Sequence, residues 1–298
     1  MQNGIRNLCT LEGLSLPELL YRTARESWQD NVFGQGGLMA FYQFLAIIPS
    51  LLAFLALSAR IPNLGDHMNH TLRELGSQVL PDQVSQLFQK TMEGLDERNL
   101  SVAQLISLCA GAVWAALNGT WAMVYGLNSA YEVQENRPWG ELGLTIAGLT
   151  LSLALTGSLA IFMTFGGALL QARLHWGAIG LRVSEWLILI PSLAVSFTVL
   201  YRFAPNVRDH KWRWSTPGAL CAVVLWIASI SAARIYFNHI NSYASSYGSL
   251  NGVVVFLLWL YVTNGAILIG GEMNSEIEKA VVARRAHSGD RPASERAE

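Results

Sequence analysis

The stretch that decides the fold is "YGSLNGVVVFLLWLYVTNGAILIGGEMNSEIEK", residues 247–279. Its largely apolar part is long enough to cross a bilayer as a helix, which takes about 20 residues. The apolar run ends at Gly270 and Gly271, and Glu272 follows directly. A carboxylate at the edge of hydrocarbon needs a donor, a cation or water. The stretch therefore predicts a membrane-spanning helix with a polar site at one end.

The rest of the chain repeats this apolar pattern. Apolar residues make up 52% of the sequence and charged residues 14%, whereas about 25% charged residues is usual in soluble domains. We expect an all-α polytopic membrane protein with about six transmembrane helices, in a membrane domain over 38–273. The expected spans are 38–60, 102–126, 142–171, 183–203, 215–237 and 249–271.

Segments outside these spans also have helical patterns. In the cytoplasmic tail 1–37, Ser15 and Pro17 mark the start of an amphipathic helix over 16–32. Its predicted apolar face is formed by Leu19, Leu20, Ala24, Ser27 and Trp28. The loop 61–101 predicts two short external helices, and 274–298 is expected to be a cytoplasmic C-terminal tail.

Charge placement predicts the orientation. Lys and Arg gather in the N-terminal tail, in the loop after the fourth span and in the C-terminal tail, whereas the opposite side carries Arg173 and Arg182 in one short loop. The long loop 61–101 also holds Arg73, Lys90 and Arg98, but loops of that size follow the charge bias weakly. Positive residues favour the cytoplasmic side, so we expect both tails in the cytoplasm. No basic patch of the kind that binds nucleic acid is present.

An internal repeat is one alternative organisation. The tetrapeptide "IPSL" occurs at 48–51 and at 190–193, so Pro49 and Pro191 are predicted helix breaks in the first and fourth spans. Two inverted three-helix halves, as in many transporters, would give such a match. Chance in an apolar-rich chain would also give it.

Five stretches together resemble the YihY/BrkB family. They are "AFYQFLAIIPSLL" (40–52), "GLNSAYEVQENRPW" (126–139), "YRFAPN" (201–206), "WRWSTPGAL" (212–220) and 247–274. The resemblance covers about residues 30 to 280. It implies a multi-pass protein of the bacterial inner membrane with about six helices. Ribonuclease BN is an old label of this family, and other names refer to virulence; the resemblance implies no catalytic residues.

Arg234 lies near the outer end of the expected fifth span. Its guanidinium can extend to the headgroups, or it can face a cavity and bind an anion, because the planar fork of Arg suits phosphate and carboxylate. Both alternatives stay open at this point.

Glu272 and Glu276 mark the inner end of the sixth span. They are either interfacial acids paired with Arg137 or with the basic 208–213 loop, or a proton or cation site. We expect Glu272 to lie within reach of Asn128, Tyr131 or Arg137, which sit at the same depth. On a continuing helix, Asn128, Tyr131, Glu132 and Glu135 share a face.

Two further polar positions complete the candidate transport site. Tyr247 belongs to an uncharged external turn that can line a mouth for a sugar or headgroup, and Asn264 interrupts the apolar sixth span. Asn264 either tunes a site or faces a partner helix.

Transport of a lipid-like or amphipathic anionic solute is the leading functional hypothesis. A non-transporting envelope scaffold or regulator comes second, and a ribonuclease or other hydrolase comes last. No Walker loop, nucleophile elbow or HExxH motif occurs, and we expect no cofactor and no metal. The expected partners are membrane lipids and a lipid-like or anionic substrate; a homo-oligomer is left open.

Overall fold

The computed structural model describes residues 15–58, 101–174, 178–207, 215–239 and 251–287. Within these ranges the chain forms only α-helices and no strand, as the apolar pattern predicts. The helices are α2 (Leu16–Gln29), α3 (Val32–Ser58), α6 (Val102–Ala130), α7 (Trp139–Leu174), α8 (Ala178–Phe203), α9 (Ser215–His239) and α11 (Asn251–His287). The all-α prediction is therefore confirmed for the described part.

Three of the described helices are long and apolar enough to cross a membrane. Their apolar parts are Val102–Ala130, Trp139–Leu159 and Phe256–Ala283. Leu187–Phe203 and Pro217–Ala232 are shorter apolar stretches of described helices. The count of six spans and the inverted repeat stay predictions.

Several expected boundaries fall inside continuous helices. α3 already begins at Val32, and α11 continues to His287. Glu272 therefore lies within a helix and not at its end. Pro49 and Pro191 likewise lie inside α3 and α8, and both helices continue past them. The expected external helices in 61–101 and the turn that holds Tyr247 lie outside the described residues.

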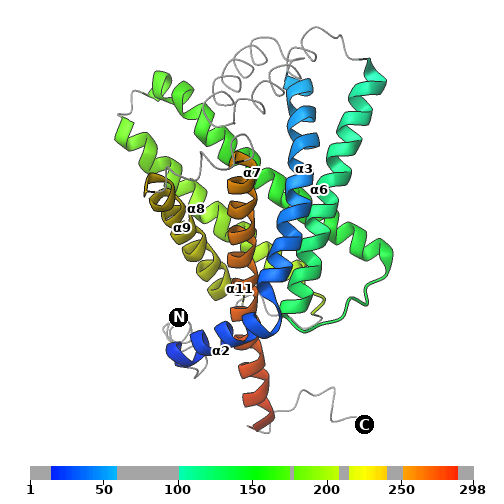
Figure 1. Cartoon of the computed structure of the whole chain (residues 1–298), viewed down its shortest axis with the longest axis vertical. Coiled ribbons are helices and arrows are strands. Elements are labelled where there is room, and N and C mark those ends of the chain that lie inside the picture. Colours follow the sequence, from blue (N-terminus) through cyan, green and yellow to red (C-terminus); the bar gives the residue numbers. More distant parts are fainter. Residues whose placement is uncertain (1–14, 59–100, 175–177, 208–214, 240–250, 288–298) are drawn as a thin grey trace. The chain divides into compact units, whose positions relative to one another are not determined.

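The amphipathic N-terminal helix is present as α2. Ser15 caps it and accepts a hydrogen bond from the backbone N–H of Glu18 at 3.4 Å, which satisfies one of the free donors of the first turn. Leu19 is completely buried in a cluster with Met273, Ile277 and Val281 of α11. In Figure 1, α2 lies beside α11.

Only part of the predicted apolar face of α2 packs against the protein. Its buried residues are Leu19, Thr23 and Ser27, whereas the side chains of Leu20 and Trp28 are 50% and 79% exposed. The buried stripe is thus shifted around the helix from the predicted face. The exposed apolar side chains suit a helix lying at a membrane surface.

The chain divides into two compact units. The first comprises 1–35, 123–226 and 265–298, and the second comprises 36–122 and 227–264. In the second unit, α3 and α11 meet through paired amides: Gln43 Nε2 donates to Asn264 Oδ1 at 3.0 Å, and Asn264 Nδ2 donates to Gln43 Oε1 at 2.8 Å. Gly119 of α6 also approaches Gln43, so small residues and amides join the helices of this unit.

Glycines allow close helix contacts in the first unit. A Cβ at Gly270 of α11 would meet the backbone oxygen of Gly218 in α9 at 2.5 Å, and a Cβ at Gly271 would meet Leu127 of α6 at 2.7 Å. Tyr201 of α8 donates its hydroxyl to the backbone oxygen of Ile267 at 2.6 Å. The two glycines before Glu272 therefore face two different helices that pack closely on α11.

Candidate functional site

The centre of the candidate site is the carboxyl group of Glu272. The side chain is completely buried, and neither of its oxygens has a hydrogen-bond partner among the described residues. The close packing at Gly271 places it beside the end of α6. The negative charge of Asp30 acts directly on this carboxyl group, although no hydrogen bond joins the two side chains. Two neighbouring carboxyl groups hold one proton between them more readily than they both carry a negative charge.

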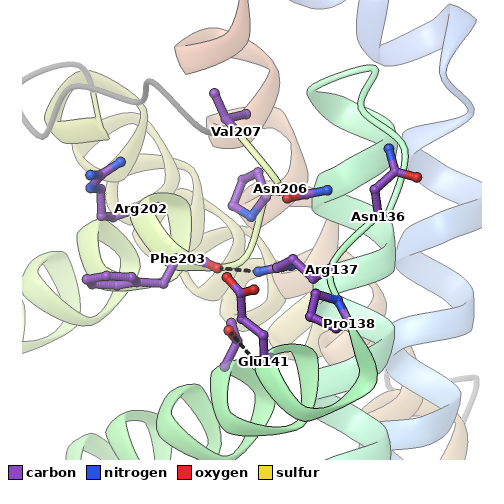
Figure 2. Close-up of a pocket in the computed structure, with 10 residues that line it drawn as sticks. Asn136, Arg137, Pro138, Glu141, Arg202, Phe203, Asn206 and Val207 are labelled. Atoms are coloured by element: carbon purple, nitrogen blue, oxygen red, sulfur yellow. Dashed lines mark hydrogen bonds between the residues drawn. The ribbon is translucent and has the colours of Figure 1, made fainter.

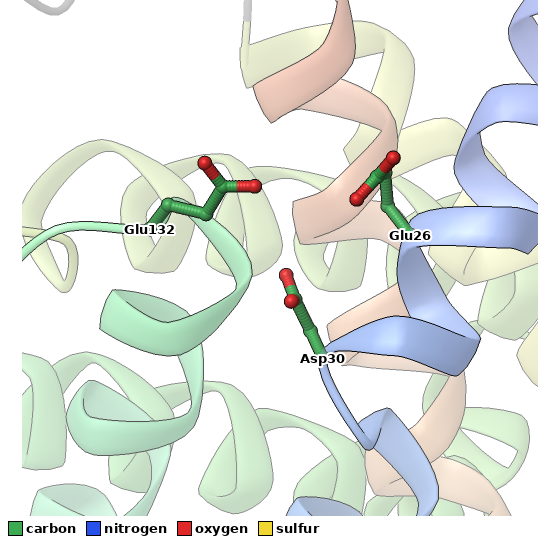
Figure 3. A group of neighbouring side chains, drawn as sticks. All are labelled: Glu26, Asp30 and Glu132. Carbon is green, nitrogen blue, oxygen red and sulfur yellow. The ribbon is translucent and has the colours of Figure 1, made fainter.

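Two further carboxylates lie beside Asp30. Glu26, Asp30 and Glu132 each offer an oxygen within 4.8 Å of the others, and Figure 3 shows the three side chains converging from α2 and from the end of α6. Asn31 and Glu132 both adopt a left-handed backbone conformation, with φ of 52°. These turns end α2 and α6 and place the acids together.

A lysine balances part of this negative charge. Lys279 Nζ lies 2.9 Å from Glu132 Oε1 and 3.0 Å from Glu276 Oε1. Glu276, which is 5% exposed, is thus an ion-paired residue. Glu272 has no such partner within the described chain, so the two acids of the sixth span differ in their environment.

Burial is the main cause that raises the pKa of the Asp30 carboxyl, and the negative charge of Glu132 adds to it. The contact with Glu272 and the charge of Lys279 oppose this rise. Asp30 therefore takes up a proton more readily than an aspartate in water.

A second polar group lies in the connection between α6 and α7. Asn128 donates to Glu135 Oε2 at 2.9 Å and accepts from the backbone N–H of Asn206 at 2.8 Å. Arg137 makes a bidentate pair with Glu135 at 2.8 and 2.5 Å and donates to the carbonyls of Phe203 and Ala204. Arg137 is the main cause that lowers the pKa of the Glu135 carboxyl. These contacts join the α6–α7 connection to the end of α8.

The connection corrects one expectation from the sequence. α6 ends at Ala130, so Glu132 and Glu135 do not continue the helical face of Asn128. The backbone N–H of Val133 donates to the carbonyl of Asn128, which closes the last turn. The helical period of the side chains cannot reveal this end, which is formed by the left-handed Glu132.

A polar pocket of about 380 Å³ opens beside this connection. Its wall includes Arg137, Glu141 at the start of α7, Arg202 at the end of α8 and Asn206 (Figure 2). No sequence pattern singled out Glu141, because an acid in the first turn of a helix is common for its dipole alone.

The predicted site residues fall in different parts of the chain's structure. Tyr131 is buried next to Glu272, and burial raises the pKa of its hydroxyl, which interacts with Asn274. Asn264 pairs with Gln43 in the other unit. Arg234 lies in α9, but its side chain and Tyr247 lie outside the described residues.

The expected contacts of Glu272 are only partly present. The end of α6 does pack against α11 at Gly271, but the structure gives Glu272 no hydrogen bond to Asn128, Tyr131 or Arg137. Arg137 is engaged by Glu135 instead. Sequence reasoning missed Asp30, because charge pairing predicts a cation opposite Glu272 and not a second acid.

Residues 23–295 match the family model "Virulence factor BrkB". The chain belongs to the BrkB family. This family agrees with the YihY/BrkB resemblance of the sequence motifs, and with the apolar helices it defines an integral membrane protein.

Curated relatives support the membrane assignment. The ribonuclease-like protein YfkH of Bacillus subtilis is 28% identical, over 81% of this chain and 88% of its own length. A UPF0761 membrane protein of Tolumonas auensis is 23% identical, over 85% of this chain and 83% of its own. A UPF0761 membrane protein of Rhodospirillum centenum is 25% identical over 84% of this chain, which spans 55% of that relative. No solved structure matches this BrkB-family chain.

Proposed function

We propose that this BrkB-family protein is a transporter of a lipid-like or amphipathic anionic solute, coupled to a proton held by Asp30 and Glu272. The observation that carries the proposal is Glu272 itself. It is completely buried and has no hydrogen-bond partner among the described residues. Ionisable groups in membrane-spanning helices are costly and are typical of ion or substrate pathways.

The surroundings of Glu272 favour a proton as the coupled ion. The negative charge of Asp30 acts on Glu272, so one proton held by the pair removes their repulsion. Lys279, whose positive charge acts on Glu272, already pairs with Glu132 and Glu276. A change in these contacts would alter proton binding, which is the link that a coupled transporter needs.

The choice of an anionic solute rests on Arg234 in α9. A guanidinium within an apolar helix stays charged and pairs with phosphate or carboxylate. The long apolar surfaces of α6 and α7 are compatible with a solute that carries acyl chains. Substitution of Arg234 by Lys keeps the charge and loses the fork, so this role predicts impaired transport with normal membrane insertion.

The test uses the purified protein in vesicles with an imposed pH gradient. A pH-sensitive dye inside reports proton movement, and a panel of labelled phospholipids and acyl-chain anions reports solute movement. We expect at least one lipid-like anion to cross faster with protein than without it, together with protons. Glu272→Gln should make solute movement independent of the gradient, whereas Glu18→Gln, an exposed acid of α2, should not.

Vesicles that stay inert across the whole panel would overturn the transporter proposal and favour the scaffold. Solute movement that responds to the gradient equally in Glu272→Gln would leave transport standing but remove the proton site. The first result tests whether the protein transports a solute, and the second tests whether Glu272 couples transport to protons.

The acidic trio gives the hydrolase alternative one specific observation. Glu26, Asp30 and Glu132 could hold a divalent metal, which nucleases use to activate water. Lys279 bonds to Glu132, however, and competes with any metal there. Cleavage of RNA by purified protein with Mg²⁺, lost in Asp30→Asn, would favour this alternative over transport.

A further inference from the structure

The pocket beside the start of α7 has the composition of a headgroup site. We infer that it binds the headgroup of a zwitterionic phospholipid, with the phosphate at Arg202 and the ammonium group at Glu141. The volume of about 380 Å³ falls within the range of small-molecule pockets, about 300–1,000 Å³. This inference does not depend on the proposed transport.

The depth of the pocket points to a lipid. Glu141 lies in the first turn of α7, whose apolar part begins at Trp139, and Arg202 lies in the last turn of α8, whose apolar part ends at Phe203. Trp139 and Phe203 are 88% and 52% exposed. An exposed Trp at the end of an apolar helix is typical of the membrane–water interface, which is where lipid headgroups lie.

Two opposite charges in the wall are available to a ligand. Glu141 and Arg202 both line the pocket, and the ion pairs among the described residues include neither of them. The guanidinium of Arg202 lies 5.9 Å from the ring centre of Phe203. The third charge, Arg137, already engages Glu135 and two backbone carbonyls. The pocket thus offers one cation and one anion.

The remainder of the wall is held in place by internal bonds. Arg137 donates to the carbonyls of Phe203 and Ala204 at 3.1 and 2.8 Å, and Asn206 Nδ2 donates to the carbonyl of Gln134 at 2.9 Å. Figure 2 shows Arg137, Phe203 and Asn206 together at this wall. A preformed wall loses little freedom on binding, so it favours a defined ligand.

The charge pattern discriminates between lipids. A phosphodiester alone would gain from Arg202 and lose from Glu141. An ethanolamine headgroup supplies an ammonium group for the carboxylate, and a charge-assisted hydrogen bond to each end would orient it. Phosphatidylethanolamine should therefore bind better than phosphatidylglycerol with the same acyl chains.

The test measures lipids retained by purified protein in mixed micelles that contain equal amounts of these two lipids, by native mass spectrometry. We expect more ethanolamine than glycerol lipid on the wild-type protein. Arg202→Gln should reduce retention of both about tenfold, the loss expected for one charge-assisted hydrogen bond. Glu141→Gln should remove the preference, and Glu141→Lys should invert it.

The controls use the exposed ion pair of α2. Arg22→Gln and Glu18→Gln remove the same charges away from the pocket, and they should leave both retention and preference unchanged. An unchanged preference in Glu141→Gln and Glu141→Lys would overturn the inference.

A second experiment competes the bound lipid with glycerophosphoethanolamine and with inorganic phosphate. Equal competition by the two would assign the pocket to free phosphate and would also overturn it.

Discussion

Helices α7 and α11 have nearly the same length, 36 and 37 residues, and both contain an apolar part that could cross a membrane. They differ in what covers them. In the most apolar stretch of each, 17% of the α7 residues are buried inside the protein and 56% of the α11 residues are. The length of an apolar stretch therefore identifies a helix that could cross a membrane, but it does not tell how much of that helix other parts of the protein cover.

The glycines show the difference at the level of single atoms. In α11, a Cβ at Gly270 or Gly271 would meet atoms of α9, α8 or α6, whereas a Cβ at Gly148 or Gly157 in α7 would meet nothing within 4 Å. Along α7, small residues recur at every fourth position from Gly148 through Ser152 and Thr156 to Ala160, and the first of these positions is open. Small side chains permit close packing, but they do not by themselves show that a partner is present.

The largest effect should come from the same substitution in the two helices. In Gly270→Ala the new methyl group would lie 2.5 Å from the backbone oxygen of Gly218. Backbone atoms cannot move away cheaply, so we expect a loss of about 3 kcal/mol, at the upper end for overpacking. Gly148→Ala, into open space, should change stability by less than about 0.5 kcal/mol. Thermal unfolding in detergent measures both. Equal losses in the two variants would contradict the difference in packing between α7 and α11.

The next effect concerns how α7 is anchored at its start. Arg137→Gln removes the ion pair with Glu135 and the donors to the carbonyls of Phe203 and Ala204. We expect a loss of about 2 kcal/mol, as for a hydrogen-bonded charge.

The pH dependence of this loss provides its control. Because Arg137 lowers the pKa of Glu135, the stabilisation is complete above the unfolded-state pKa and is lost as pH falls through the folded-state pKa. The wild-type and Arg137→Gln unfolding temperatures should converge in acid. A constant difference at every pH would show that the ion pair is not its source.

A smaller loss of stability should follow from removing one polar side chain from each helix. Asn264→Ala in α11 leaves the amide of Gln43 without its partner, and we expect a loss of about 1 kcal/mol, within the range of interhelical hydrogen bonds. Thr156→Val in α7 removes one hydroxyl bond to Ser196 and should cost less. A double-mutant cycle of Gln43 and Asn264 should give a coupling energy; a value of zero would mean that the amides do not hold α3 to α11.

The smallest effect concerns protonation next to α11. The folded-state pKa of Asp30 is raised, so the folded protein binds its proton more tightly than the unfolded chain does. Stability should therefore increase as pH falls from neutral through the folded-state pKa, and Asp30→Asn should flatten this part of the profile. A wild-type profile that already falls with acid over this range would contradict the prediction.

Local patterns of the sequence predicted much of the fold. The Ser15 cap, the apolar runs and the α11 helix depend on neighbouring residues, and the structure has them. The second span was expected to end at 126, but α6 continues to Ala130. The helical face expected to include Glu132 and Glu135 is absent, because the left-handed backbone of Glu132 lies beyond the end of the helix.

The candidate site was harder to predict. Glu272 was recognisable because an acid beside an apolar run needs an explanation. Its neighbour Asp30 was not, since about 240 residues separate the two acids and simple electrostatics would keep them apart. Arg202 and Glu141 each had an ordinary reason for their position, and only the folded chain places both on one pocket.

The docking of α2 on α11 has a consequence for biosynthesis. Leu19 fills a cluster with Met273, Ile277 and Val281, which the ribosome adds much later. At about 5–20 residues per second, this interval is on the order of 10–50 s. During it, Leu19 has no native partner and α2 presents apolar side chains on more than one side. In a nascent chain arrested before Met273, α2 should therefore be accessible to membrane proteases or chaperones. In a chain arrested after α11 is complete, α2 should be protected from them.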